Sequence, residues 1–194
     1  MTPDEAEAMK QVAQRRSQKH YCTVLIGVDV GARAEEMTEI KPLNVRRSEN
    51  GRFLVRIEDG KDTTGEMGGK SRDAFLPDHV ERELYELKVE NDLGEDEPFL
   101  NVTQTRIRQR VTEVAEEIAD RIEDGEDWPG MPSDWRKVSS HDLRRYWAQH
   151  CLRRKQMDPQ IVMAVGGWSS FDKIKPYLQS PTESNIVSEF ESKF

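Results

Sequence analysis

Hydrophobic residues recur at helical spacing along most of the chain. The clearest stripe lies within residues 107–122, where the apolar positions follow one another at steps of 4, 3, 4 and 4: Ile107, Val111, Val114, Ile118 and Ile122. Such spacing places all five side chains on one face of an α-helix. We therefore predict a long amphipathic helix there, with its stripe in the core.

Start signals predict further helices. Thr2 followed by Pro3 is an N-cap with proline in the first turn, and it predicts a helix to about Lys19. An apolar segment, residues 21–30, follows and stops at Gly31. Helices are also predicted over residues 32–40 and 183–194, from Asp78, from Ser139 or Ser140, from Pro159, and from Ser169 or Ser170.

One region has the alternation of a β-sheet. Residues 52–58 read RFLVRIE, and residues 72–76 can alternate again before Pro77, with a glycine-rich stretch between the two segments. This pattern predicts an antiparallel hairpin with a long loop. Residues 123–137 are predicted to form another loop. The fold class is therefore mainly α with a small antiparallel β-sheet (α+β).

Composition favours a single polar globular domain. The chain has 194 residues, 34% of them charged and 35% hydrophobic, with a mean hydropathy of -0.83. No apolar run approaches the roughly 18 residues of a membrane span, and the N-terminus lacks a signal-peptide pattern, so we expect a cytoplasmic protein without a membrane partner. Cys22 and Cys151 lie far apart, which predicts reduced thiols.

The net charge of -8 conceals a segregation along the chain. Residues 81–127 hold 16 acidic and 6 basic side chains, whereas residues 131–179 hold 9 basic and 4 acidic ones. The second region can therefore bind phosphates despite the overall charge. Arginine (18) outnumbers lysine (11), which suits bidentate phosphate contacts but also fits an acid-rich, lysine-poor surface adapted to high salt.

Three motifs fail on spacing. Residues 65–71, GEMGGKS, miss the P-loop pattern by one position and lead into a predicted strand. His20 with Cys22 and His150 with Cys151 could supply four zinc ligands, but adjacent helical residues point about 100° apart. The acidic loop at 123–127 lacks EF-hand spacing. We predict neither a cofactor nor a metal.

A different group of residues suits phosphate chemistry. His141 and Arg144 lie three apart near a helix N-terminus, where the dipole and free N–H groups attract an anion. By themselves they could decorate a solvated face. Downstream, residues 165–170 read VGGWSS, and Tyr177 follows nine residues after Trp168. This combination is much less common than a histidine and an arginine three residues apart.

Together these residues resemble the tyrosine recombinases, the integrase family of site-specific DNA strand-exchange enzymes. The family pattern is His-x-x-Arg, then a Leu-Gly-His/Trp-Ser segment, then a tyrosine, and here these positions are His141, Arg144, Trp168 and Tyr177. An earlier arginine in a Gly-x-Arg-x-x-Glu turn is matched by Arg33 within residues 31–36, and a hairpin lysine by Lys61, with Lys70 as the alternative.

The resemblance implies a role for each residue. Tyr177 would attack DNA and form a 3′-phosphotyrosyl link, Arg33 and Arg144 would bind the phosphoryl oxygens, and Lys61 would protonate the 5′-oxygen. His141 would accept a proton or hydrogen-bond the phosphate, and Trp168 would support a phosphate oxygen. Glu36 would fix Arg33 or orient His141.

Each position has an ordinary structural alternative. Arg33 and Glu36 could form a surface ion pair, Trp168 could be a core residue, and Tyr177 could pack with Phe171 and Ile174. Six matches in order favour the functional interpretation.

The resemblance covers essentially the whole chain. It implies a catalytic domain over residues 1–182 and a tail helix, 183–194, that docks on a neighbouring protomer. Val165 replaces the usual leucine, Trp168 the commoner histidine, and the hairpin loop is long. The family's N-terminal core-binding domain has no counterpart, so the chain is expected to be an excised fragment or to work alone. An archaeal or halophilic source is one further expectation.

The expected function is site-specific recombination of double-stranded DNA by a homo-oligomer, as a tetrameric synapse. One alternative is relaxation of supercoils in the manner of a type IB topoisomerase. Another is a non-catalytic, integrase-derived DNA-binding regulator, whose mark would be loss of Tyr177 or of an arginine. Neither loss is seen.

Overall fold

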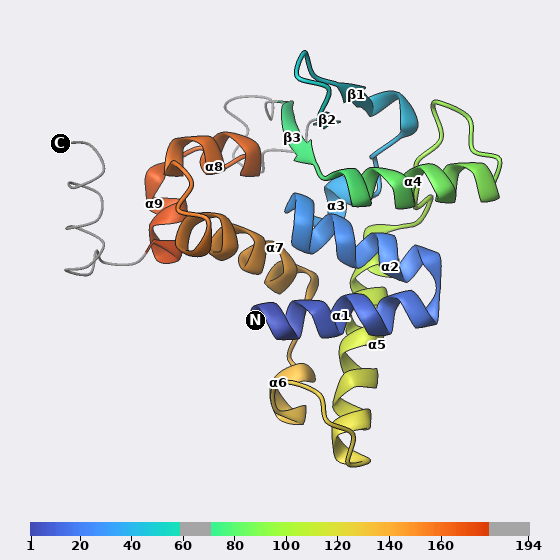
Figure 1. Cartoon of the computed structure of the whole chain (residues 1–194), viewed down its shortest axis with the longest axis vertical. Helices are drawn as coiled ribbons and strands as arrows, with labels where there is room; N and C mark the ends of the chain where they lie inside the picture. Colours follow the sequence, from blue (N-terminus) through green and yellow to red (C-terminus); the bar gives the residue numbers. More distant parts are fainter. Residues whose placement is uncertain (59–70, 179–194) are drawn as a thin grey trace.

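The computed structural model describes residues 1–58 and 71–178, and helices dominate them (Figure 1). One three-stranded antiparallel sheet, in the order β1-β2-β3, lies at one end of the molecule. The predicted class, mainly α with a small antiparallel sheet, is confirmed. Lys61, Lys70 and the tail at 183–194 lie outside the described residues.

The N-terminal region forms two helices, so the prediction of one helix to about Lys19 is wrong at its end. Helix α1, Pro3–Arg16, begins with the predicted cap, because the Thr2 hydroxyl accepts a hydrogen bond from the backbone N–H of Glu5. Ser17 is extended, and its hydroxyl caps α2, Gln18–Leu25. A local side-chain bond thus competes with helix continuation.

A π-helical turn, Ile26–Val30, extends α2 to Gly31, whose φ of 76° ends it. Helix α3 covers only Ala34–Met37, which is shorter than the predicted 32–40, because Arg33 is still in the extended conformation. A 3-10 turn, Pro42–Asn44, leads into the sheet.

The predicted hairpin is present as β2, Phe53–Ile57, and β3, Arg72–Leu76, with Ile57 opposite Arg72. A third strand, β1, Val45–Arg47, pairs with β2 and was not predicted, since three residues are too few to show alternation. Within β3, Ala74 and Leu76 are buried. Because strand side chains alternate, Arg72 shares their core-facing side.

The remaining elements are helical. They are α4 (Asp78–Glu90), α5 (Gln104–Glu123), α6 (Pro132–Trp135), α7 (Ser140–Gln149), a π-helical turn (His150–Arg154), α8 (Pro159–Gly166), α9 (Phe171–Ile174) and a 3-10 turn (Lys175–Tyr177). The predicted stripe of α5 is buried from Ile107 to Ile118, which confirms its core role. The predicted loop at 123–137 contains α6, whose Trp135 is buried.

The buried residues form three clusters. One joins α2, α3, the sheet and α4, and a second joins α1, α2 and α5. The third lies among the C-terminal helices, where Trp147, Val162, Ile174 and Tyr177 pack together. The last part of the described chain thus has its own small core, and Tyr177 belongs to it.

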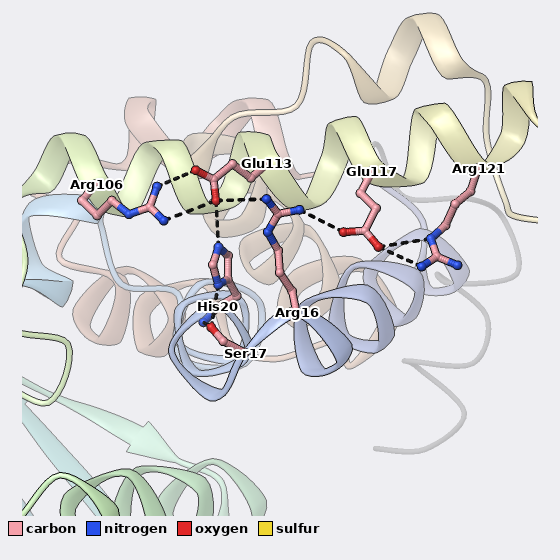
Figure 2. Close-up of polar contacts among 7 residues, drawn as sticks. All are labelled: Arg16, Ser17, His20, Arg106, Glu113, Glu117 and Arg121. Carbon is pink, nitrogen blue, oxygen red and sulfur yellow. Dashed lines mark hydrogen bonds and ion pairs between the residues drawn. The ribbon is translucent and has the colours of Figure 1, made fainter.

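Ion pairs fasten α1 and α2 to α5 (Figure 2). Glu113 of α5 accepts hydrogen bonds from His20 at 2.9 Å and from Arg106 at 2.5 Å. Arg16 lies 3.6 Å from Glu113 and 2.9 Å from Glu117. The hydrogen bond from Arg106 lowers the pKa of Glu113 to about 2, so this carboxylate is charged at neutral pH.

Candidate active site

A buried glutamate collects arginines from separate parts of the chain. The side chain of Glu36 is fully buried, and its carboxylate accepts 2.8 Å hydrogen bonds from both terminal nitrogens of Arg72. It also accepts from the backbone N–H of Arg33 at 2.7 Å and from Nη1 of Arg33 at 2.5 Å. Nη1 of Arg144 lies 3.9 Å from it.

This cluster is electrostatically unbalanced, with three guanidinium groups around one carboxylate. Burial opposes ionisation of Glu36, but the hydrogen bonds and charges of Arg72 and Arg33 prevail and lower its pKa to about 2. Burial and the charge of Arg33 lower the pKa of Arg144 to about 9, against the opposing pull of Glu36. Glu36 and Arg144 are therefore both ionised at neutral pH, and with three guanidinium groups around one carboxylate the cluster is positive.

The same three arginines cap the C-terminal end of α8. Nε of Arg72 donates to the Val165 carbonyl at 2.7 Å, Nη2 of Arg144 donates to the carbonyl of Gly166, and Nη2 of Arg33 donates to that of Gly167 at 3.1 Å. The last carbonyls of a helix lack partners within the helix and carry its negative dipole end. Each arginine thus supplies a hydrogen bond and a favourable charge.

Two glycines allow the close packing. The carbonyl of Gly31 accepts from Nη1 of Arg144 at 2.8 Å, and a Cβ on Gly31 would lie 2.4 Å from the Trp147 ring. A Cβ on Gly166 would lie 1.9 Å from the Trp168 ring. Glycine is therefore required at positions 31 and 166 by contacts with tryptophan rings.

Aromatic rings connect the arginines to the tyrosine. The Arg144 guanidinium lies 4.3 Å from the centre of the Trp168 ring, a cation–π arrangement. The Trp168 ring centre is 6.1 Å from that of Trp147 and 5.8 Å from that of Tyr177. Tyr177 is buried, and its carbonyl accepts from Nε of Arg153 at 2.9 Å.

A cleft of about 520 Å³ opens beside this cluster. Arg33, Arg144 and His141 line it, together with Arg108 and Ser139. His141 is exposed. The arrangement offers an anion a concave, positively charged surface.

The structure thus brings Arg33, Glu36, Arg144, Trp168 and Tyr177 into one connected group. His141 lies on the adjoining cleft, and among the described residues no hydrogen bond joins it to Tyr177 or to Glu36. Arg33 and Glu36 do form the ion pair of the structural alternative, but its location at the surface is wrong, because the Glu36 side chain is fully buried.

Sequence reasoning missed Arg72. Its spacing matches no motif considered above, but one pattern could have identified it. In the segment RDAFL, the alternation that buries Ala74 and Leu76 places Arg72 on the same side. An arginine at an inward-facing strand position needs a buried partner, because an unpaired buried charge is costly.

Other candidate chemistry finds no support among the described residues. Burial raises the pKa of the Cys22 thiol to about 12 and that of Cys151 to about 11, so neither is a ready nucleophile. Within residues 1–58 and 71–178, no group of three or more His, Cys, Asp or Glu side chains could hold a metal ion. Over the same residues, no helix has the length and apolarity to cross a membrane.

Comparisons with known proteins agree with this geometry. The phage integrase family model matches residues 1–183. XerA recombinase superposes with a TM-score of 0.69 at 18% identity, over 99% of this chain and 64% of that protein. The Tn1549 transposon integrase in complex with circular intermediate DNA gives a TM-score of 0.68 at 15% identity, over 98% of this chain and 64% of that chain. Among curated protein sequences, none matches.

XerH recombinase bound to its difH substrate gives a TM-score of 0.69 at 18% identity, over 98% of this chain and 52% of that protein. The chain thus spans less than two thirds of each of these proteins. At such identities the structural likeness establishes the fold, and the family model establishes the kinship. The chain belongs to the phage integrase family and has the catalytic-domain fold of the tyrosine recombinases.

Proposed function

We propose that this chain is the catalytic domain of a site-specific DNA recombinase that cleaves and rejoins DNA through a 3′-phosphotyrosyl intermediate. One observation carries the proposal. Arg33, Arg144 and His141 line a single cleft, and Arg144 contacts the Trp168 ring that packs against Tyr177. This grouping of cations and a histidine near Tyr177 supports phosphoryl transfer to that tyrosine.

Arg33 and Arg144 neutralise the phosphate. A phosphodiester gains negative charge on its non-bridging oxygens when a nucleophile adds to phosphorus, and fixed guanidinium groups stabilise that charge. Both arginines are held by Glu36 and by the end of α8, so little reorganisation is required during the reaction. Trp168 supports Arg144 from its ring face.

Tyr177 supplies the nucleophile. Its oxygen forms a bond to phosphorus while the bond from phosphorus to the DNA 5′-oxygen breaks, and the energy of that bond is kept for rejoining. The tyrosyl proton passes to His141, and Lys61 or Lys70 gives a proton to the 5′-oxygen. Rejoining reverses these transfers with a 5′-hydroxyl from another strand.

Double-stranded DNA is the proposed substrate, and a homo-oligomer on DNA the proposed assembly. XerH recombinase and the Tn1549 integrase, which share the fold, have been solved with DNA. A topoisomerase-like activity uses the same chemistry but relaxes supercoils without pairing two sites, so exchange between two separate duplexes distinguishes them. The presence of Tyr177 and both arginines argues against a non-catalytic regulator.

The test is formation of a covalent adduct. The chain is incubated in EDTA with a pool of nicked duplexes of random sequence, on which a cleaved strand end diffuses away and the adduct accumulates. We expect an adduct with the wild-type chain and none with Tyr177→Phe, at a DNA affinity changed by no more than a few-fold, because the hydroxyl contributes to chemistry rather than binding.

Tyr85→Phe is the matched control, because this tyrosine is exposed on α4 and lies outside the site. It should form the adduct as the wild type does. The proposal fails if the wild-type chain yields no adduct, if the Tyr177→Phe variant yields one, or if cleavage strictly requires magnesium.

A further inference from the structure

Arg72 is the most heavily engaged arginine of the site, and the family motifs considered above do not include it. Its side chain is only 10% exposed. Both terminal nitrogens hold the Glu36 carboxylate at 2.8 Å, and Nε donates to the Val165 carbonyl at 2.7 Å. These three contacts use the fork geometry of a guanidinium, which a lysine cannot reproduce.

The contacts of Arg72 coincide with those that hold the two phosphate-binding arginines. Arg33 rests on Glu36 and on the carbonyl of Gly167, and Arg144 rests near Glu36 and on the carbonyl of Gly166. Arg72 holds the same carboxylate and the same end of α8. Displacing Arg72 would therefore loosen the supports that Arg33 and Arg144 share.

The packing around Arg72 is close. Gly167 has a φ of 67°, and a Cβ on it would lie 3.0 Å from the Arg72 guanidinium. Arg72 is also the first residue of β3, where it pairs with Ile57. In the sequence, the connection between these two paired positions contains Lys61 and Lys70.

Resting on the proposed function, we propose that Arg72 is a positioning residue for strand transfer. By holding Glu36 and the end of α8 together, it fixes the guanidinium groups of Arg33 and Arg144 for the phosphate. All three of its side-chain nitrogens donate to protein acceptors and its side chain is shielded from solvent, so it acts through these two arginines.

The test compares Arg72→Lys and Arg72→Gln with the wild type in single-turnover cleavage at saturating DNA, well below the melting temperature. A displacement of about 1 Å in a catalytic group costs on the order of 100-fold in rate, so we expect at least that loss in both variants. DNA affinity should change by only a few-fold. Failure of lysine to restore the rate identifies the fork geometry, rather than the charge alone, as essential.

Arg46→Gln is the matched control. Arg46 lies on the same sheet and is ion-paired with Asp73, but its side chain is 51% exposed. The register pairs Arg46 with Leu54 and Leu54 with Phe75, so Arg46 lies on the face of the sheet opposite to Arg72. Its cleavage rate at saturating DNA should equal that of the wild type. A comparable loss in this variant would show that any disturbance of the sheet slows cleavage, and would overturn the specific role of Arg72.

A second substrate separates positioning from general destabilisation. In a methylphosphonate, one non-bridging oxygen of the scissile phosphate is replaced by a neutral methyl group, so less charge needs arginine stabilisation. If Arg72 acts through Arg33 and Arg144, the loss of cleavage rate in the Arg72 variants, relative to the wild type, should be at least tenfold smaller on this substrate. The ratio of the two rates is independent of the fraction of protein that is folded.

The outcomes also separate the two proposals. If the wild-type chain forms no covalent adduct, the proposed function fails. If the wild type cleaves and Arg72→Lys cleaves at the wild-type rate, or loses equally on both substrates, the function stands and the role of Arg72 is wrong.

Discussion

Gly31 shows how one residue determines the position of a side chain in the candidate site. Its φ of 76° ends the π-helical turn, and its carbonyl accepts a hydrogen bond from Arg144. The Trp147 ring occupies the space where a Cβ would be. The first glycine of the Gly-x-Arg-x-x-Glu turn thus serves backbone conformation, ring packing and arginine placement together.

Gly31→Ala should therefore cost more than backbone strain alone. A non-glycine residue in the left-handed region costs about 1–3 kcal/mol. Here the Cβ would also lie 2.4 Å from the Trp147 ring, which has to move. We expect a loss of unfolding free energy of more than about 3 kcal/mol in urea denaturation.

Gly51→Ala provides the control for this measurement. Gly51 has nearly the same φ, 75°, but a Cβ on it would meet nothing within 4 Å. The Gly51→Ala variant should lose only the unfolding free energy that corresponds to backbone strain. Equal losses in the two variants would show that the tryptophan contact is energetically unimportant.

At the scale of elements, the site is a junction of α3, β3 and α8. Glu36 comes from the first, Arg72 opens the second, and the capped carbonyls end the third. Each element is short, and α8 directly contacts β3. The junction depends on a single buried carboxylate, so that carboxylate determines its stability.

Glu36→Gln should destabilise the chain strongly. It leaves buried guanidinium groups without their counter-charge, a change that costs about 3–5 kcal/mol in comparable buried ion pairs. The loss is measured by urea denaturation at pH 7. Glu35→Gln is the control, because Glu35 is exposed on the same helix and its change should stay within about 0.5 kcal/mol.

The difference in unfolding free energy between the wild type and Glu36→Gln should depend on pH, which gives a further check. The folded-state pKa of Glu36, about 2, is below its ordinary value of 4.5. The contribution of the ionised Glu36 carboxylate to the free energy of unfolding is therefore complete above pH 4.5 and is lost as the pH falls toward 2. The stability difference between the wild type and Glu36→Gln should shrink over that range. A difference independent of pH would contradict the ion-pair explanation.

At the scale of the whole molecule, charge is segregated along the chain. The acidic region at 81–127 includes most of α4 and all of α5, whereas the basic region at 131–179 includes the helical segments that hold His141, Arg144 and Tyr177. The total charge of -8 therefore conceals a basic region that carries most of the candidate site residues, where the local charge favours an anion such as phosphate.

Assembly is a property of the whole molecule, and the tail sequence makes it testable. Ile186, Val187, Phe190 and Phe194 are spaced to share one side of a helix. We expect Phe190→Ala combined with Phe194→Ala to weaken assembly of protomers on DNA more than it lowers the stability of the isolated chain. Sedimentation of the DNA complex and thermal unfolding of the free protein measure the two effects.

The opposite result is equally informative. If assembly is unchanged while the melting temperature falls by several degrees, the tail packs on its own domain, and docking on a neighbouring protomer is wrong.

The sequence by itself determined the helices with clear stripes and caps, the hairpin, and the order of the family positions. These features depend on neighbours within a few residues, so periodicity and capping residues are sufficient to predict them. The break at Ser17 is also local, because the Ser17 hydroxyl caps α2, but it lies in a polar segment, residues 14–20, where the apolar spacing shows no interruption. The strand β1 was too short to show any period.

Only the tertiary structure decided how the site is held together. The burial of Glu36, the capping of α8 by three arginines and the contacts of Arg72 join residues such as 36, 72 and 165, which are distant in sequence. Their meeting requires the register of β3 against β2 and the docking of α8 beside β3. Contacts between distant segments leave no periodic pattern in a single sequence, because each segment alone satisfies only its local geometry.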